Sequence, residues 1–147
     1  MMSGEGVFVR DAMKENVITI ESSDSIKDAA IKMSNANIGA IIVTENKFPV
    51  GILTERDFVR RVYAKGIPAS SPVSEVMSKP LITIDPDETV WELAQLMKTK
   101  NIHKTPVIEN DKLIGIVTNT DLVSMVSLGS DSEMRRVCDQ IFSHMKN

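Results

Sequence analysis

The residues best suited to bind a ligand occur as two pairs with the same spacing. Thr54 lies three positions before Asp57, and Thr118 lies three positions before Asp121. A glycine and two aliphatic residues come directly before each threonine. A carboxylate can accept hydrogen bonds from two neighbouring hydroxyl groups at once, in charge-assisted bonds worth about 1.5–3 kcal/mol each. If a helix begins at each threonine, its free N–H groups can also attract an anion.

The same pairs have a purely structural explanation. A threonine at the N-cap of a helix and an acidic residue three positions later cap the helix without any ligand. The two interpretations are compatible, because a capping carboxylate can still turn one oxygen toward a bound hydroxyl. The residues alone therefore leave both open.

Both pairs belong to a longer internal repeat. Met13 aligns with Met77, an offset of 64 residues, and this offset holds without a gap for about 50 positions. Roughly a third of the aligned residues are identical. A period of this length indicates two whole supersecondary units. Because a repeat unit that cannot close its own core usually packs against its twin, we expect the two halves to pair.

The hydrophobic pattern predicts the same elements in each half. Apolar residues recur at i, i+3, i+4 and i+7 after Ser25 and again after Thr89, which indicates two amphipathic helices with capped starts. Short apolar segments predict strands at 17–20, 38–43 and 50–53, and at 81–84, 105–108 and 113–117. A further helix is expected after Thr54 and after Thr118. The predicted fold class is α/β (α+β), with two β-α-β-β-α repeats packed with pseudo-two-fold symmetry.

The repeat also predicts the domain boundaries. Residues 7–63 form the first repeat, 64–74 a linker rich in glycine and proline, and 75–128 the second repeat. Residues 129–147 carry an apolar stripe of helical spacing and predict an amphipathic C-terminal helix. Three partners for that helix stay open: its own module, a second copy of the chain, or another protein.

The segments 51–57 and 115–121 carry a family resemblance. They read Gly-Ile-Leu-Thr-Glu-Arg-Asp and Gly-Ile-Val-Thr-Asn-Thr-Asp, and both fit a glycine–hydrophobic–hydrophobic–Thr-x-x-Asp signature at a strand-to-helix junction. Met13, Met77 and the stretch 106–108 add to the match. The chain thus resembles a tandem pair of CBS domains, a Bateman module, over about residues 7–126.

The resemblance implies an adenosine-containing ligand, namely AMP, ADP, ATP, S-adenosylmethionine or methylthioadenosine, in two clefts between the repeats. In such modules the signature aspartate holds the ribose hydroxyls, and the threonine hydroxyl or nearby amides approach the phosphate. Carried over to this chain, the first cleft comprises Ile52, Thr54, Arg56 and Asp57 with Ile82, His103 and Lys104. The second comprises Ile116, Thr118, Asn119 and Asp121 with Ile18, Gly39 and Ala40.

The two halves differ at one informative place. His103 and Lys104 occupy the positions that Gly39 and Ala40 occupy in the first repeat. The resemblance implies that basic residues here reach a phosphate, so the two clefts are expected to differ in their preference for phosphorylated ligands. The alternative is a solvated surface pair.

Composition narrows the classes of function. The net charge of −3 gives no reason to expect nucleic acid. No apolar run approaches the roughly 20 residues of a membrane span, and no secretion signal is recognisable, so the cytoplasm is the expected location. Cys138 is the single cysteine and the two histidines are far apart in sequence, so no metal is expected.

No catalytic arrangement is recognisable in the sequence. It contains no phosphate-binding P-loop, no Gly-x-Gly-x-x-Gly motif and no nucleophile paired locally with a histidine. Its length matches a paired module with short ends, so we expect a non-enzymatic allosteric regulator, for example in energy sensing, that acts in trans on a partner protein. The rival is a ligand-independent scaffold. A homodimer through the helices is expected, and Arg60 and Arg61 are expected to form a solvated helical face.

Overall fold

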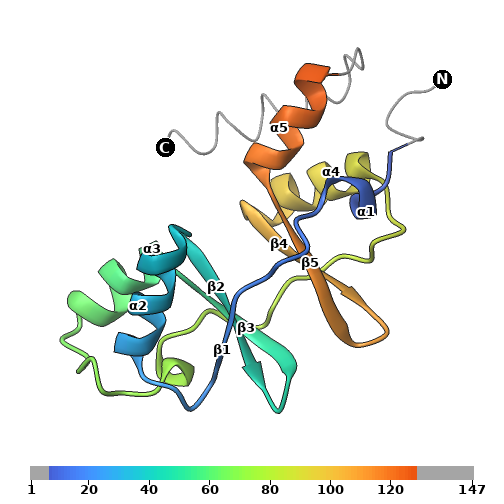
Figure 1. Cartoon of the computed structure of the whole chain (residues 1–147). Coiled ribbons are helices and arrows are strands. Elements are labelled where there is room, and N and C mark those ends of the chain that lie inside the picture. Colours follow the sequence, from blue (N-terminus) through green and yellow to red (C-terminus); the bar gives the residue numbers. More distant parts are fainter. Residues whose placement is uncertain (1–6, 129–147) are drawn as a thin grey trace. The chain divides into compact units, whose positions relative to one another are not determined.

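The computed structural model describes residues 7–128, which divide into two compact units (Figure 1). The 17–82 unit comprises Val17–Ile82. The 83–128 unit comprises the described residues from Thr83 onward together with residues 7–16. The mixture of helices and small sheets confirms the predicted α+β class. Within the described residues, no helix is long and apolar enough to cross a membrane.

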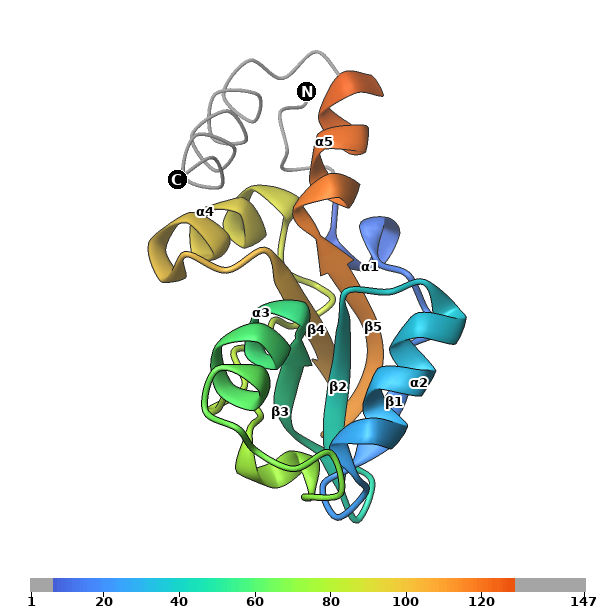
Figure 2. The ribbon, with the colours of Figure 1, turned by 90° about the vertical axis from the view of Figure 1, so that its left-hand side faces the viewer.

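A three-stranded sheet and flanking helices form the 17–82 unit (Figure 2). The strand order is β1–β2–β3, with β1 parallel to β2 and β2 antiparallel to β3. The elements are β1 (Thr19–Glu21), α2 (Ile26–Ala36), β2 (Ala40–Glu45), β3 (Phe48–Thr54), α3 (Glu55–Asp57), a π-helical stretch (Phe58–Tyr63) and a 3-10 turn (Val73–Glu75).

Local sequence signals set both ends of α2. The Ser25 hydroxyl accepts a hydrogen bond from the N–H of Asp28 at 3.0 Å, as the capping pattern predicts. Asn37 ends the helix in the left-handed conformation, with φ of 55°, which asparagine tolerates better than most residues. The buried face of α2 joins a core made of Ile20, Ile26, Ala29, Met33, Ile41, Val43, Leu53, Val73, Val76 and Met77.

The 83–128 unit follows the same plan around a two-stranded hairpin. Its elements are α1 (Val9–Ala12), α4 (Val90–Lys100), β4 (Lys104–Glu109), β5 (Lys112–Thr118) and α5 (Asn119–Leu128). The hydroxyl of Thr89 accepts from the N–H of Glu92 at 3.1 Å, and Asn101 ends α4 with φ of 53°. The core consists of Val9, Ile84, Val90, Leu93, Ala94, Met97, Val107, Val117 and Leu122.

The strand predicted at 81–84 is reduced to one isolated parallel bridge, between Ile84 and Val107. At the equivalent place in the 17–82 unit, the N–H of Ser22 extends the pairing by donating to the carbonyl of Thr44 at 2.8 Å. Pro86 stands at the repeat position of Ser22 and Pro106 at that of Ile42, which pairs with Thr19 in β1, and neither proline has an N–H to donate. The pairing of the segment around Ile84 with β4 therefore lacks hydrogen bonds that the pairing of β1 with β2 possesses.

In each unit, a closing segment pairs with one strand of the hairpin. This segment contains Met13 in the 83–128 unit and Met77 in the 17–82 unit. In the 17–82 unit, Ser78 exchanges backbone hydrogen bonds of 2.8 and 3.1 Å with Ile52 in β3. In the 83–128 unit, Lys14 exchanges the equivalent bonds of 2.9 and 3.0 Å with Ile116 in β5. The segment 7–16, which begins the first sequence repeat, therefore packs on the hairpin of the second.

Charged contacts and a buried side chain attach the segment 7–16 to the rest of the 83–128 unit. The guanidinium of Arg10 forms ion pairs with Glu109 and with Asp87, the latter at 3.3 Å. Hydrogen bonds to Glu109 and Asp87 raise the pKa of the Arg10 guanidinium above its usual value. Because these groups are largely exposed, the main anchor is the buried Val9 side chain.

Replacing Gly51 by alanine is expected to lower the free energy of unfolding by about 1–3 kcal/mol, because the glycine lies against the closing segment. A Cβ at Gly51 would lie 2.7 Å from the sulfur of Met77 and 3.0 Å from the carbonyl oxygen of Ser78. The methionine can move, but the carbonyl is held by its bond to Ile52. Denaturant unfolding measures the change, and an unaltered midpoint would show that the segment shifts without cost.

Candidate ligand-binding site

The first Thr-x-x-Asp pair forms a complete helix cap where β3 ends and α3 begins. The N–H and the hydroxyl of Thr54 donate to Oδ2 of Asp57, at 2.9 and 3.1 Å. The Thr54 hydroxyl oxygen in turn accepts from the N–H of Asp57 at 3.3 Å. The capping interpretation is therefore confirmed, and it fixes the orientation of a carboxylate that is buried in the structure.

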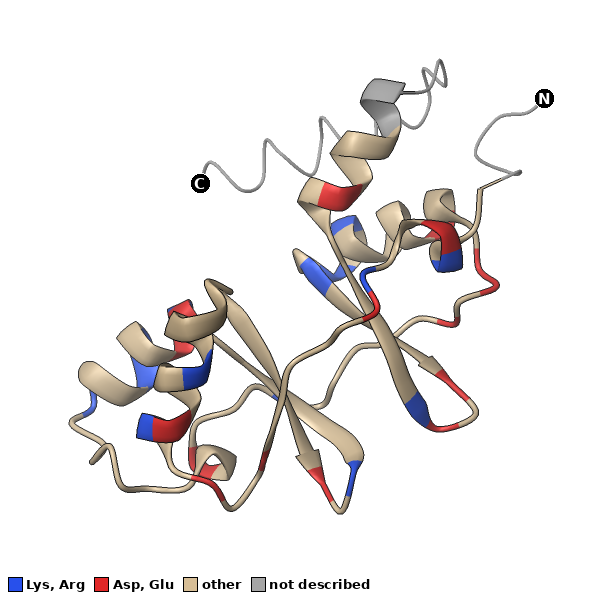
Figure 3. Cartoon of the chain, in the orientation of Figure 1, with Lys and Arg blue, Asp and Glu red and all other residues tan. Residues whose placement is uncertain are grey.

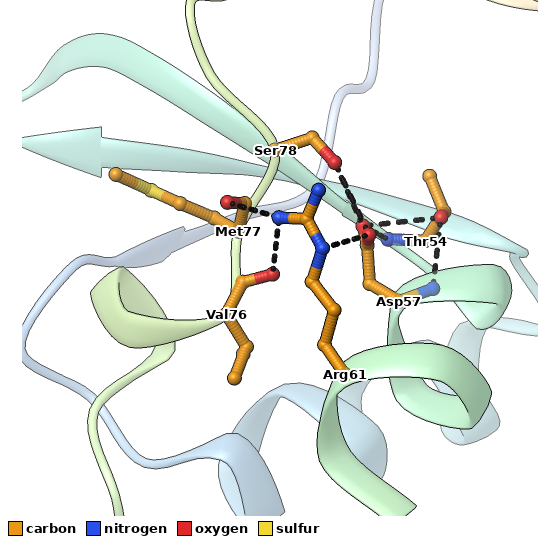
Figure 4. Close-up of polar contacts among 6 residues, drawn as sticks. All are labelled: Thr54, Asp57, Arg61, Val76, Met77 and Ser78. Carbon is orange, nitrogen blue, oxygen red and sulfur yellow. Dashed lines mark hydrogen bonds and ion pairs between the residues drawn. The ribbon is translucent and has the colours of Figure 1, made fainter. Parts of the chain in front are cut away.

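The outer oxygen of Asp57 is also engaged within the same unit (Figure 4). Oδ1 accepts from the Ser78 hydroxyl at 3.1 Å and lies 3.5 Å from Nε of Arg61. Nη1 of Arg61 donates to the carbonyl oxygens of Val76 and Met77, at 3.3 and 3.0 Å. Arg61 therefore connects the signature carboxylate to the closing segment.

The second pair repeats the inner half of this arrangement where β5 meets α5. The N–H and hydroxyl of Thr118 donate to Oδ2 of Asp121, at 2.9 and 3.0 Å, and the N–H of Asp121 donates back at 3.2 Å. The outer oxygen differs: Oδ1 lies 3.5 Å from Nζ of Lys14. The Lys14 side chain is 72% exposed and that of Asp121 is 12% exposed. This outer oxygen therefore borders an exposed ammonium group at the surface.

In the 17–82 unit, several predicted residues lie beside the first pair. Ala40 pairs in register with Thr54, and the Gly39 carbonyl accepts from the N–H of Glu55 at 3.1 Å. Ile18 precedes β1, Ile52 lies within β3, Arg56 is exposed on α3 and Ile82 ends the unit. The small residues Gly39 and Ala40 thus belong to the Asp57 junction of their own unit.

In the 83–128 unit, the basic residues take the corresponding places. Lys104 pairs in register with Thr118, and the His103 carbonyl accepts from the N–H of Asn119 at 2.9 Å. His103 and Lys104 thus lie beside the Asp121 junction of their own unit. Their assignment to a cleft with Asp57 stays a prediction, as does the complementary assignment of Gly39 and Ala40.

Acidic and basic residues are interspersed over each unit (Figure 3). The local charge at the two junctions nevertheless differs. Lys14 and Lys104 accompany Asp121, whereas Arg61 accompanies Asp57 and is tied to backbone carbonyls. Each junction therefore has an exposed cation that can turn toward an anionic ligand, Lys14 at Asp121 and Arg56 next to Asp57.

Sequence reasoning missed three contributors to these junctions. The expectation that Arg61 is merely solvated is wrong, because its guanidinium bonds to two carbonyls and to Asp57. Its i, i+4 spacing from Asp57 was an available signal. Ser78 and Lys14 each follow a repeat methionine, and only the long-range pairing to β3 and β5 brings them to the carboxylates.

Comparison with known proteins agrees with this architecture. The CBS domain model matches residues 9–64 and 73–128. The CBS domain-containing protein YhcV of Bacillus subtilis is 38% identical over 78% of this chain and 81% of its own length. The protein MK0525 of Methanopyrus kandleri is 37% identical over 81% of this chain, and the match spans 62% of that longer protein.

A solved structure of the same kind carries ligands. The CBS domain pair of protein MJ0100, in complex with 5′-methylthioadenosine and S-adenosyl-L-methionine, matches with a TM-score of 0.74 and 28% identity. The match covers 82% of this chain and 96% of that one. This chain belongs to the CBS domain family, as a tandem pair. Proteins of this family are in general regulatory rather than catalytic.

Proposed function

We propose that this chain binds an adenosine-containing ligand and acts as a non-catalytic regulatory module on a partner protein. The observation that carries the proposal is the oriented carboxylate at each strand-to-helix junction. Two donors from the preceding threonine hold the inner oxygen of Asp121, so its outer oxygen has a set direction. Such a group suits a ribose diol, which AMP, ADP, ATP, S-adenosylmethionine and methylthioadenosine share.

Two further observations support this choice of ligand. The domain pair of MJ0100 was solved with two adenosine compounds bound. In this chain, the basic residue Lys104 lies in register with Thr118, which directly precedes α5. A helix start and a cation together favour a phosphate or another anionic group attached to the nucleoside.

A thermal-shift screen with AMP, ADP, ATP, S-adenosylmethionine and methylthioadenosine tests the proposal. A ligand at 100 times its dissociation constant adds about 2.7 kcal/mol to the free energy of unfolding. For a chain of this size the melting temperature should rise by about 5–10 °C. Inosine monophosphate serves as the matched control for the adenine base. If millimolar concentrations of all five compounds leave the melting temperature and the calorimetric heat unchanged, the proposal is wrong.

A ligand-independent scaffold is the second candidate function, and one surface favours it. The 17–82 unit has a groove of about 480 Å³ lined by Ala30, Met33, Ser34, Asn37, Ile38, Glu55, Phe58 and Val59. Val59, which lines the groove, is 66% exposed, and Tyr63 at the end of the same π-helical stretch is 88% exposed. Exposed apolar side chains of this kind suit a protein contact, such as a homodimer. Sedimentation that gives the same assembly with and without ligand, together with a failed ligand screen, would favour this function.

A further inference from the structure

The two signature carboxylates are held alike on one oxygen and differently on the other. The repeat offset places Ser78 at the position of Lys14, and Arg61 at the position of Met125. In the 17–82 unit the outer oxygen of Asp57 accepts a hydrogen bond from the Ser78 hydroxyl and forms an ion pair with the Arg61 guanidinium. In the 83–128 unit the outer oxygen of Asp121 meets the ammonium group of Lys14.

The hydrogen-bonding capacity of a carboxylate is limited, so the groups already bound to Asp57 and Asp121 affect how well each can bind a ligand. An ionised carboxylate offers about four lone-pair positions. The Asp57 carboxylate accepts hydrogen bonds from two Thr54 groups and from the Ser78 hydroxyl, and its Oδ1 also lies 3.5 Å from the Arg61 guanidinium as an ion pair. The Asp121 carboxylate accepts hydrogen bonds from two Thr118 groups, and its Oδ1 forms an ion pair with the mostly exposed Lys14 side chain.

From this we infer that Arg61 and Ser78 occupy the place of a ribose diol at Asp57, so that Asp121 is the stronger anchor and Arg61 sets the inequality of the two sites. The inference rests on the proposed function. A diol at Asp57 must displace Ser78 or Arg61 from Oδ1, whereas at Asp121 only an exposed lysine has to turn. Arg61 does not leave easily, because its Nη1 stays bonded to the carbonyls of Val76 and Met77.

Arg61 could either attract a ligand to Asp57 or compete with the ligand for Asp57. An exposed arginine beside a binding carboxylate can also attract an anionic ligand, and its removal would then weaken binding. If Arg61 instead competes with the ligand for Asp57, its removal strengthens binding at that junction. The sign of the change therefore distinguishes the two roles.

The test measures AMP binding by calorimetry in the full chain with Asp121→Ala, which leaves Asp57 as the remaining signature carboxylate. Adding Arg61→Met, the residue that the other repeat carries, should raise the affinity for AMP about tenfold. Adding Arg60→Met instead removes the same charge from an exposed neighbour and should leave the affinity within twofold. The reciprocal Met125→Arg change in the otherwise wild-type chain should weaken the tighter site.

Hydrogen exchange supplies a readout that needs no ligand. Arg61→Met should speed amide exchange at residues 76–78, because the guanidinium holds the carbonyl groups of Val76 and Met77, and Arg60→Met should not. Weaker AMP binding in Arg61→Met, or equal effects of the two methionine variants, would overturn the inference while leaving the proposed function intact. Absence of AMP, ATP and methylthioadenosine binding to the wild type and to every variant would overturn the proposed function, and the inference with it.

Discussion

Asp121→Ala is expected to weaken binding of an adenosine ligand by about 10- to 100-fold, which corresponds to about 1.4–2.8 kcal/mol. The alanine removes the carboxylate that is proposed to accept hydrogen bonds from the ribose hydroxyls. The fold should survive, because the change also costs only a helix cap worth about 1 kcal/mol. Calorimetric titration with AMP measures the affinity, and thermal unfolding without ligand measures the stability.

Asp57→Ala is the matched control for this experiment, because it removes an equivalent cap from the other unit. It should lower binding less than Asp121→Ala does. Its cost in stability should be larger, because Asp57 is buried and also holds Ser78 and Arg61. A folded Asp121→Ala protein that binds AMP as tightly as the wild type, with unchanged stoichiometry, would rule out the role of Asp121.

The double variant His103→Ala/Lys104→Ala is expected to lose at least about tenfold in its preference for AMP and ATP over methylthioadenosine. The reason is that these two residues are the basic pair that the first repeat lacks, and Lys104 lies in register with Thr118. A cation contributes much less to the binding affinity when the ligand carries no phosphate. Competition calorimetry across the three ligands measures the preference, and methylthioadenosine affinity should stay within a few-fold of the wild-type value.

A second double variant controls for the general loss of positive charge. Lys100→Ala/Lys112→Ala removes two exposed lysines from the same unit, at the end of α4 and the start of β5. It should leave the ranking of the ligands unchanged. If the wild type and the His103/Lys104 variant rank AMP, ATP and methylthioadenosine identically, these residues do not contact a phosphate.

Local signals explain why much of the fold was predictable. The helix starts at Ser25 and Thr89 carry their own capping residues, and the helix ends carry asparagines that adopt left-handed conformations. The hairpins follow from apolar strands joined by short polar turns, and the structure extends each predicted strand of β3 and β5 only at its ends. Such features depend on neighbours within a few residues, so the sequence contains them in full.

Features that depend on distant neighbours were not predictable in this way. The shortened pairing at 81–84 depends in part on the N–H that Pro106 in β4 lacks, although the residues from Leu81 to Ile84 alone predict a strand. The role of Arg61 depends on two carbonyls 15 and 16 residues away in the chain. Helical periodicity places Arg61 on the surface, but it cannot indicate which backbone groups reach that surface.

The sequence by itself determined the repeat, the helices and hairpins within each half, and the two capped carboxylates, because all of these follow from local pattern and from the constant offset. Only the tertiary structure decided which segment closes which hairpin. Lys14 in the segment 7–16 pairs with Ile116 in β5, and Ser78 pairs with Ile52 in β3. Met13 and Met77 are alike, and each faces a glycine, so the pattern fits either partner. The choice of partner decides whether Lys14 or Ser78 reaches each aspartate, and therefore makes two similar motifs unequal.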